Sequence, residues 1–497
     1  MKYLFYFYSC FNSTMFGGLV DEAVELAKDS DNEVLFAYCG GINKTCRVIN
    51  DKASSSMCRF CKKCTCKVLQ QYGIKSISLN EFAESNDVHF DYKNAKELRD
   101  IKYRDVNIGM SIMSGYISST RNQLPLIDDE ARRYFDFHLC QNVMFVDALY
   151  NLIKEFAPET IYSFNGRFEE VRPLFDISHK LGIICYMTEV IKKNGVWFKV
   201  RFKDNLPHDI KYNLQRRHFC WDNYAMTEEE KLDLGNSFYK KRRNGEDSGD
   251  VKIYVANQKE GNYNGFKKDK INIAIFNSSE DEFAAVGGDW EALKIFPNQY
   301  EGIVYLVENA PENVHFILRI HPNLKDIPYK FHKDLYNLPK RYNNITVIPA
   351  DSEASTYTIM ENCDTIICFG STMGVESSYW GKPAILLGPS MYYYDDVVYV
   401  PKSKEEALQL LSQKLEPKGN IELLKFGAYI LNKDPLIVET NQINCDLNKR
   451  RFLGKSYLTT PYINYLFGEK LTGLYIAINR YFRYNLGKLE MPRKEEL

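Results

Sequence analysis

Short apolar runs and longer amphipathic segments alternate along most of this chain of 497 residues. Residues 2–8, 33–38, 160–164 and 182–186 are rich in Ile, Leu, Phe and Tyr and have the length of buried strands. Segments with helical spacing lie between them. Strands that alternate with helices predict a parallel sheet with helices on both faces, so we expect residues 1–225 to form a doubly wound α/β domain.

The same alternation restarts in the second half, with strands expected at 271–276, 314–320, 345–348, 365–369 and 384–387. Between the halves, Thr227 and Glu230 make a capping-box pair that opens a polar helix, which ends in a basic run before an Asn/Gly/Asp-rich stretch. We therefore interpret residues 226–265 as a linker and 266–440 as a second doubly wound domain. A C-terminal segment, 441–497, follows it.

Composition narrows the class of protein. Sixty-four Lys and Arg against 65 Asp and Glu give a net charge of −1, so the chain is not a polycation built to bind nucleic acid. Thirty-five Tyr and 30 Phe residues indicate folded cores, and no apolar run has the length of a membrane span. The odd count of 13 Cys, most of them scattered, is typical of reduced thiols in a cytoplasmic protein.

The most informative motif joins the strand at 365–369 to the next helix through Gly370-Ser371-Thr372-Met373-Gly374. Free backbone N–H groups, two hydroxyls and the positive end of a helix converge there, which predicts an anion site. Gly370 and Gly374 would let the backbone approach a phosphate, and Glu376 could accept hydrogen bonds from sugar or ribose hydroxyls. The structural alternative is an ordinary turn in which Ser or Thr caps the helix.

Three other loops are expected at the same edge of the second sheet. The strand at 314–320 ends in Arg319 and His321, two donors that suit a phosphate or diphosphate. Ser278 and Ser279 follow the strand at 271–276, and the loop 349–355 leads from the next strand to a helix. Because open α/β sheets bind ligands at the carboxyl ends of their strands, these loops together predict a phosphate-binding edge.

These motifs resemble those of the bacterial capsule and surface-polysaccharide glycosyltransferases of GT-B architecture, in which two Rossmann-like domains face a central cleft. In the second half the resemblance rests on Ser278-Ser279-x-x-Glu282, Arg319-x-His321-Pro322, Asp351-x-x-x-Ser355, Gly370-Ser371-Thr372-x-Gly374-x-Glu376 and Gly381-Lys382-Pro383. In the first half it rests on Gly109-Met110-Ser111, Ser118-x-x-Arg121, Asn165-Gly166-Arg167-Phe168 and Leu206-Pro207-His208-Asp209.

The resemblance implies that the two halves bind different substrates. The second half would bind a nucleotide-sugar donor through Ser278, Ser279, Arg319, His321, Ser371, Thr372, Gly374 and Glu376. The first half would bind a polysaccharide or lipid-linked acceptor through Asn165, Arg167 and His208. Arg167, His321 and a general base, Glu169, would be the catalytic groups, and no metal cofactor would be required.

Three functions fit these motifs. The first is transfer of a sugar from a nucleotide-sugar to a capsule or O-antigen type polysaccharide or its lipid-linked precursor. The second is a polyol-phosphate transferase or a sugar-nucleotide epimerase, because both use similar pairs of domains and phosphate loops. The third is a non-catalytic scaffold for polysaccharide assembly.

Four thiols form a cluster at Cys58, Cys61, Cys64 and Cys66. Their Cys-x-x-Cys spacing could hold a structural zinc ion, and the alternative is a set of reduced or partly disulfide-bonded thiols in a loop.

The C-terminal segment combines charge with aromatic side chains. Residues 449–488 contain eight basic residues and one acid, together with many Tyr, Phe and Leu. This composition predicts reversible attachment to an anionic membrane surface, and hence a cytoplasmic protein that is peripheral at the inner membrane. The alternative is a helix that packs back across both domains.

Overall fold

The computed structural model describes residues 1–10, 13–46, 55–84, 86, 88–193, 196–248, 258–261, 263–325, 327–431 and 438–439. These residues divide into two compact units. The first comprises Met1–Pro207 and takes up residues 438–439, and the second comprises the described residues from His208 to Leu431. The second unit begins at His208. From the sequence we expected the first domain to extend to residue 225.

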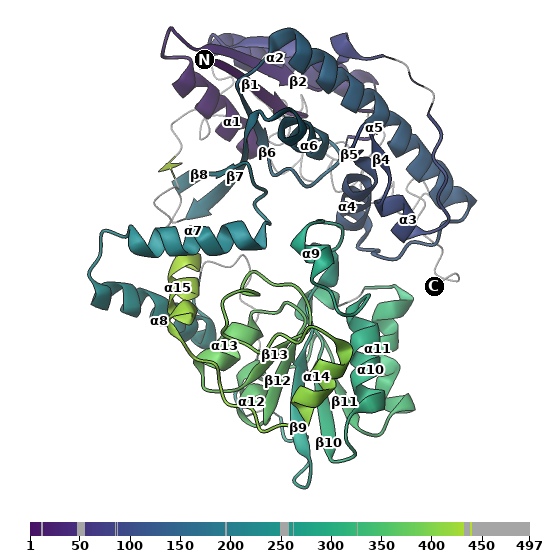
Figure 1. The fold of residues 1–497 in the computed structure, drawn as a ribbon, viewed down its shortest axis with the longest axis vertical. Helices are drawn as coiled ribbons and strands as arrows, with labels where there is room; N and C mark the ends of the chain where they lie inside the picture. The colour runs from purple at the N-terminus through teal and green to yellow at the C-terminus, as the bar shows by residue number, and fades with distance from the viewer. Residues whose placement is uncertain are drawn as a thin grey trace, which may run out of the picture. The chain divides into compact units, whose positions relative to one another are not determined.

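The first unit is built on a seven-stranded sheet with the order β14-β8-β7-β6-β1-β2-β3 (Figure 1). Strands β3, β2, β1, β6 and β7 are parallel, whereas β8 pairs antiparallel to β7 and to β14. The chain thus runs outward from β1 in one direction and from β6 in the other. The strands are β1 (Lys2–Phe7), β2 (Glu33–Tyr38), β3 (Lys75–Ser78), β6 (Thr160–Phe164), β7 (Ile184–Lys193), β8 (Val196–Lys203) and β14 (Val438–Glu439).

Six α-helices of the first unit connect these strands, and a two-stranded ribbon of β4 (Lys102–Tyr103) and β5 (Val106–Asn107) lies among them. The helices are α1 (Ser13–Leu26), α2 (Ser55–Gln71), α3 (Ala95–Arg99), α4 (Ile108–Thr120), α5 (Asp129–Phe156) and α6 (Arg172–Leu181), with a 3-10 turn η2 (Leu79–Phe82). The side chains of β1 are buried after Lys2, as expected for a parallel strand covered on both faces.

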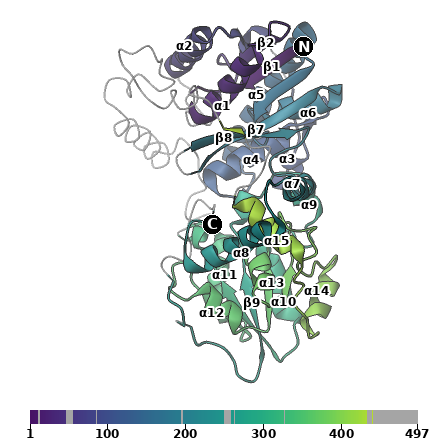
Figure 2. The same ribbon diagram turned by 90° about the vertical axis from the view of Figure 1, so that its left-hand side faces the viewer.

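The second unit contains a five-stranded parallel sheet with the order β11-β10-β9-β12-β13. Its strands are β9 (Ile271–Phe276), β10 (Val314–Arg319), β11 (Ile345–Ile348), β12 (Thr365–Cys368) and β13 (Ala384–Leu386). Alternate residues of β9 enter two different cores: Ile273 and Ile275 pack with residues of α10 and α11, and Ala274 and Phe276 with residues of α8, α12 and α13. Helices therefore cover both faces of this sheet (Figures 1 and 2).

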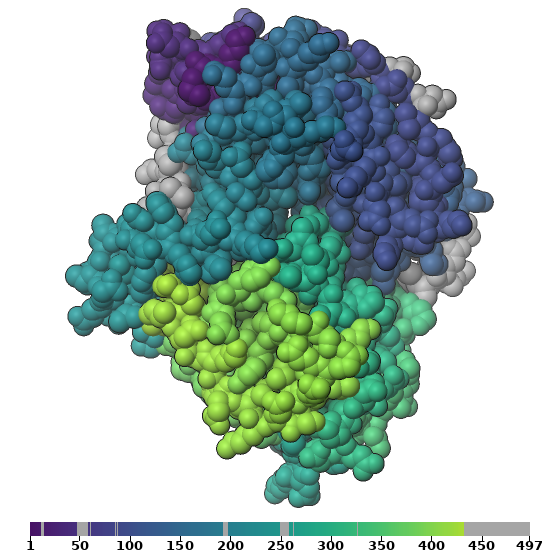
Figure 3. Space-filling view, in the orientation of Figure 1, coloured from purple at the N-terminus to yellow at the C-terminus, as the bar shows by residue number. Residues whose placement is uncertain are grey.

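The helices of the second unit are α7 (Ile210–Asp222), α8 (Glu228–Asn244), α9 (Asp289–Ala292), α10 (Gln299–Asn309), α11 (Lys330–Arg341), α12 (Thr356–Glu361), α13 (Met373–Tyr379), α14 (Lys404–Leu411) and α15 (Ile421–Ile430), with 3-10 turns η3 (Glu280–Glu282) and η4 (Pro322–Leu324). Figure 3 shows the segments after β13, coloured light green to yellow, as a continuous surface on one face of this unit.

Helix α8, which the sequence placed in a linker, is part of the second unit. Its predicted capping box is confirmed, since Thr227 and Glu230 bond each other's backbone N–H groups. The helix crosses α15 at two glycines, where a Cβ on Gly235 would lie 2.5 Å from the carbonyl oxygen of Leu424 and one on Gly427 would lie 2.6 Å from that of Gly235. The close crossing fixes α8 beside the sheet.

The predicted fold class is confirmed, because each unit is an α/β structure whose parallel strands have the order 3-2-1-4-5, to which the first unit adds the antiparallel pairs β7–β8 and β8–β14. In the described part of the chain, no helix is long and apolar enough to cross a bilayer. The C-terminal segment 441–497, with the predicted membrane-binding stretch 449–488, lies outside the described residues.

Candidate functional site

A cavity of about 540 Å³ opens in the second unit at the carboxyl ends of β9, β10 and β12. From β9 the chain moves to β10 on one side of the sheet and later returns to β12 on the other, so the strand order reverses between β9 and β12. Doubly wound sheets bind ligands at this switch point. The volume is in the range of small-molecule sites.

The loop after β9 forms one wall of the cavity, but its hydroxyls bind protein atoms. Ser278 Oγ donates to the carbonyl oxygen of Phe369 at 2.9 Å and accepts a hydrogen bond from Gln299 Nε2 at 2.8 Å. Ser279 Oγ donates to Asp281 Oδ1 at 2.9 Å. Both serines line the cavity as predicted, and these bonds tie the end of β9 to the end of β12.

Arg319, the last residue of β10, is 4% exposed and lines the cavity. Its Nη1 donates to the carbonyl oxygen of Pro349 and its Nη2 donates to that of Ser352 at 2.8 Å. Among the described residues, its buried Nε–H has no hydrogen-bond acceptor. Burial lowers the pKa of the guanidinium, which nevertheless stays charged because an arginine pKa lies far above neutrality. Arg319 thus carries a positive charge beside the cavity, and its buried Nε–H is a donor without an acceptor among the described residues.

His321 is held in a defined orientation at the same edge. Its backbone N–H donates to Asn277 Oδ1 at 2.8 Å, and its ring Nδ1 accepts from the backbone N–H of Asn323 at 3.2 Å. A backbone N–H can only donate, so Nδ1 of a neutral ring is unprotonated and Nε2 carries the hydrogen. This tautomer gives His321 a donor for a phosphate oxygen.

The loop after β12 has the positive φ expected of glycine at Gly370, with a value of +108°. At Gly374 a Cβ would lie 2.3 Å from the hydroxyl oxygen of Tyr392, so the missing side chain makes room for this ring, and the approach of a phosphate to Gly374 stays a prediction. Ser371 Oγ accepts from the backbone N–H of Met373 at 3.3 Å, whereas Thr372, the N-cap residue of α13, makes no side-chain cap bond.

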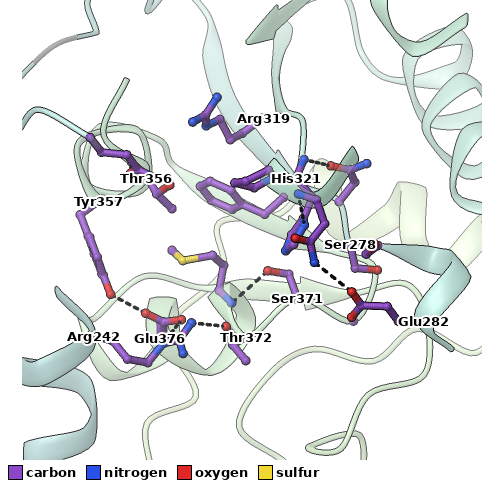
Figure 4. Close-up of a pocket in the computed structure, with 18 of the residues that line it drawn as sticks. Arg242, Ser278, Glu282, Arg319, His321, Thr356, Tyr357, Ser371, Thr372 and Glu376 are labelled. Carbon is purple, nitrogen blue, oxygen red and sulfur yellow. Dashed lines mark hydrogen bonds and ion pairs between the residues drawn. The ribbon is translucent and has the colours of Figure 1, made fainter. Parts of the chain in front are cut away.

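Glu376 is also committed to the protein. It is 1% exposed, and its carboxylate accepts from Arg242 Nε at 2.9 Å and from the hydroxyl of Tyr357 (Figure 4). Arg242 Nη2 donates to Thr372 Oγ1 at 2.9 Å. Both carboxylate oxygens of Glu376 therefore bind protein groups in the structure, and its role as an acceptor for ribose hydroxyls stays a prediction.

The sequence analysis missed Arg242 and Tyr357 as parts of this site. Arg242 comes from the basic end of α8 and Tyr357 from α12, and both line the cavity. No sequence motif connects these two residues with the loop after β12. They meet it only because α8 packs against the sheet. The basic residues at the end of α8 were the one sequence feature that could have indicated a partner for Glu376.

In the first unit, Asn165, Arg167 and Glu169 follow β6 as predicted. Asn165 has φ +60°, and its side chain accepts from the backbone N–H of Arg167 at 3.1 Å. Arg167 is buried, and its Nε donates to Ser114 Oγ at 2.6 Å. These bonds hold the loop in a tight turn at the carboxyl end of β6.

Glu169 does not have the exposure of a general base. It is 1% exposed and contacts His138 Nδ1 at 2.9 Å, Thr45 Oγ1 at 3.1 Å and Asn142 Nδ2 at 3.3 Å. These polar groups compensate the burial of the carboxyl group of Glu169, whose catalytic role stays a prediction.

A second carboxyl near this turn has unusual acidity. Asn165 Nδ2 donates to Glu189 Oε1, and Glu189 lies on β7, one residue beyond the pairing of Thr188 with Phe164. Burial raises the pKa of Glu189 to about 7, although the bond from Asn165 opposes the rise. No sequence motif distinguished this residue.

His208, predicted to bind the acceptor, is the first residue of the second unit. Its carbonyl oxygen accepts from Trp290 Nε1 at 2.7 Å, a bond that anchors the start of α7 to α9.

The four clustered thiols lie on helix α2, not in a loop. Five residues of an α-helix turn through about 500°, so Cys61 and Cys66 lie on different faces. Cys66 Sγ donates to the hydroxyl of Tyr38 at 3.2 Å, whereas Cys61 lies beside Ser9 and Cys10. The described residues contain no group of three or more His, Cys, Asp or Glu side chains placed to hold a metal ion, and zinc binding by Cys58, Cys61, Cys64 and Cys66 stays a prediction.

Comparisons with known proteins show only distant similarity. No protein-family model and no curated protein matches the sequence. Among solved structures, KpsC of Thermosulfurimonas dismutans, a beta Kdo 2,7 transferase, is 15% identical over 56% of this chain and 79% of its own, with a TM-score of 0.35. The UDP-GlcNAc 2-epimerase of Neisseria meningitidis is 13% identical over 88% and 96%, with a TM-score of 0.22. The calicheamicin glycosyltransferase CalG4 is 8% identical over 86% and 93%, with a TM-score of 0.25. Similarities at this level do not identify the reaction.

Proposed function

We propose that the protein is a glycosyltransferase that uses a nucleotide-sugar, and that the nucleoside diphosphate part of the donor binds in the cavity of the second unit. The observation that carries the proposal is the position of this cavity at the switch point of a parallel sheet, with Arg319, whose buried Nε–H lacks an acceptor among the described residues, in its wall. A buried N–H without an acceptor costs about 1–3 kcal/mol, and a phosphate oxygen would remove that cost.

The other cavity groups fit the same ligand. His321 would donate from Nε2 to a phosphate oxygen, while the charge of Arg319 would stabilise the negative charge that develops on the leaving diphosphate. Glu376 neutralises Arg242 at 2.9 Å, so the charge of Arg319 would attract an anion and the neutral ring of His321 would add a hydrogen-bond donor. The backbone and hydroxyls of Ser371 and Thr372 form the adjoining wall. This chemistry requires no metal ion.

We propose a surface polysaccharide or its lipid-linked precursor as the acceptor, on the basis of the motif resemblance in the first half. A sugar-nucleotide epimerase would bind the same donor, and product analysis separates the two reactions. A transferase releases the nucleotide and makes a new glycosidic bond, whereas an epimerase returns a nucleotide-sugar with an inverted carbon.

Donor binding is tested by thermal denaturation of the full chain with UDP-, GDP-, CDP- and CMP-sugars. A ligand at 100 times its Kd stabilises the native state by about 2.7 kcal/mol, which raises the melting temperature of a unit of this size by about 5–11 °C. Arg319→Met should abolish the shift. Arg341→Met removes an exposed arginine on α11 and should leave it unchanged. The proposal is refuted if no nucleotide stabilises the protein, or if Arg319→Met keeps the full shift while folding normally.

A further inference from the structure

Two thiols from distant parts of the sequence meet at the carboxyl end of β1 in the first unit. Cys10 follows β1 in a turn, and Cys61 lies on α2. Their Sγ atoms are 3.9 Å apart. Cys10 is 1% exposed, whereas Cys61 is partly open to solvent. The pair thus joins a buried cysteine to one that is partly exposed.

The groups around the pair make the two sulfurs chemically different. Cys61 Sγ lies in hydrogen-bond contact with the thiol of Cys10 and, at 3.5 Å, with the hydroxyl of Ser9. The thiol of Cys10, the hydroxyl of Ser9 and a backbone N–H lower the pKa of Cys61 to about 6, and burial raises the pKa of Cys10. The lowered pKa increases the fraction of Cys61 that is thiolate near neutral pH, and the thiolate is the form that reacts as a nucleophile.

We propose that Cys10 and Cys61 form a redox site that is oxidised by a small hydroperoxide to an intramolecular disulfide. The Cys61 thiolate, which is partly open to solvent, attacks one peroxide oxygen, the O–O bond breaks, and Cys61 becomes a sulfenic acid while hydroxide, or alkoxide, leaves. The Cys10 sulfur then attacks Cys61 Sγ, the S–O bond breaks, and the hydroxyl leaves with the Cys10 proton as water. Two thiols lose two electrons and the peroxide gains them.

The distance between the two sulfurs permits the second step. A disulfide bond is about 2.05 Å long, so the sulfurs must approach by roughly 2 Å. The neighbouring thiols are placed differently: Cys66 donates to the hydroxyl of Tyr38, and burial together with the charge of Cys61 raises the pKa of Cys58. Cys64 is the competitor, because it also interacts with Cys10, but it is buried and less open to a peroxide.

Trypsin places Cys10, Cys58 and Cys61 on three different peptides and leaves Cys64 and Cys66 together on a fourth, so a Cys10–Cys61 link can be identified. Cleavage at the Lys and Arg residues of α2 places Cys58, Cys61 and the Cys64/Cys66 pair on the separate peptides 53–59, 60–62 and 64–67, and Cys10 lies on 3–28. The reduced full chain is treated with hydrogen peroxide, blocked with an alkylating reagent, digested and analysed by mass spectrometry. The expected product is peptide 3–28 linked to peptide 60–62. A link from 3–28 to 64–67, or oxidation of Cys61 without a link, would overturn the proposal.

Reactivity of the intact protein gives a second measurement that does not depend on variants. At pH 6, Cys61 should be alkylated at least ~10-fold faster than Cys58, because the larger thiolate fraction outweighs the lower nucleophilicity of a more acidic thiol. Cys61→Ser should abolish the linked peptide, and Cys66→Ser on the same helix should leave it. Equal alkylation of Cys58 and Cys61 at pH 6 would refute the assignment of Cys61 as the attacking thiol.

Discussion

The raised pKa of Glu189 makes a quantitative prediction about stability. Burial raises this pKa from the ordinary value of 4.5 to about 7, so the folded state holds a proton that the unfolded chain loses. The stability from this group is complete below about pH 4.5 and is lost as the pH rises to about 7. Replacing Glu189 by Gln keeps an oxygen that accepts from Asn165 and removes the charge.

The size of the effect follows from the shift. A difference of about 2.5 pKa units corresponds to about 3 kcal/mol at 1.36 kcal/mol per unit. Glu189→Gln should therefore stabilise the folded protein by about 3 kcal/mol at pH 8 and by less than about 1 kcal/mol at pH 5. For a unit of roughly 200 residues, the gain at pH 8 raises the melting temperature by about 6–12 °C.

Scanning calorimetry of the full chain at pH 5 and pH 8 measures this difference. Glu84→Gln is a matched control, since Glu84 also accepts from an asparagine amide, Asn151 Nδ2 at 3.1 Å, but at an exposed site. The control should change the melting temperature equally at both pH values. If Glu189→Gln had the same effect at pH 5 and pH 8, or destabilised the protein at pH 8, the assignment of a buried, protonated carboxyl would be wrong.

Three further predictions test other parts of the structure. Arg242→Met leaves the buried carboxylate of Glu376 without its cation and should cost about 3 kcal/mol of unfolding free energy, whereas Arg243→Met, whose partners Glu260 and Glu361 are exposed, should cost less than about 1 kcal/mol in the same denaturation assay. Gly374→Ala forces a Cβ against Tyr392 and should destabilise by about 1–3 kcal/mol, with partial recovery in the double variant with Tyr392→Phe. The full chain should sediment with anionic vesicles and dissociate as salt rises, whereas a chain ending at residue 447 should not; equal sedimentation of the two would exclude the C-terminal segment as the membrane contact.

The strands and the order of the loops could be predicted because each depends on local sequence. Buried parallel strands are continuous apolar runs, and the predicted strands 33–38, 160–164 and 271–276 agree with β2, β6 and β9. The residues after β9, β10 and β12 then had to lie at one edge, and they line a single cavity.

The partners of those residues could not be predicted, because they come from tertiary packing. The sequence shows that Glu376 lies on the first turn of a helix, but not that Arg242 and Tyr357 reach its carboxylate. In the same way, the Cys-x-x-Cys spacing was interpreted without knowing that a helix spans it, and a helix turns Cys61 and Cys66 to different faces. The burial of Glu169 also could not be predicted from the sequence, because His138 and Asn142, which contact its carboxyl group, come from α5.

The pairing of β14 with β8 affects when the sheet of the first unit can be completed during synthesis. Residues 438–439 pair with β8 at the edge of the first sheet, so the polypeptide leaves the first unit at residue 207 and supplies its last strand only after the whole second unit has been synthesised. Some 235 residues separate the end of β8 from β14, which takes a ribosome roughly 12–50 s at 5–20 residues per second. During that time the backbone groups of β8 that later bond β14 are open to other extended chains. A fragment ending at residue 207 would keep this edge permanently, so the nascent protein and any separately expressed first unit share one point of vulnerability to aggregation.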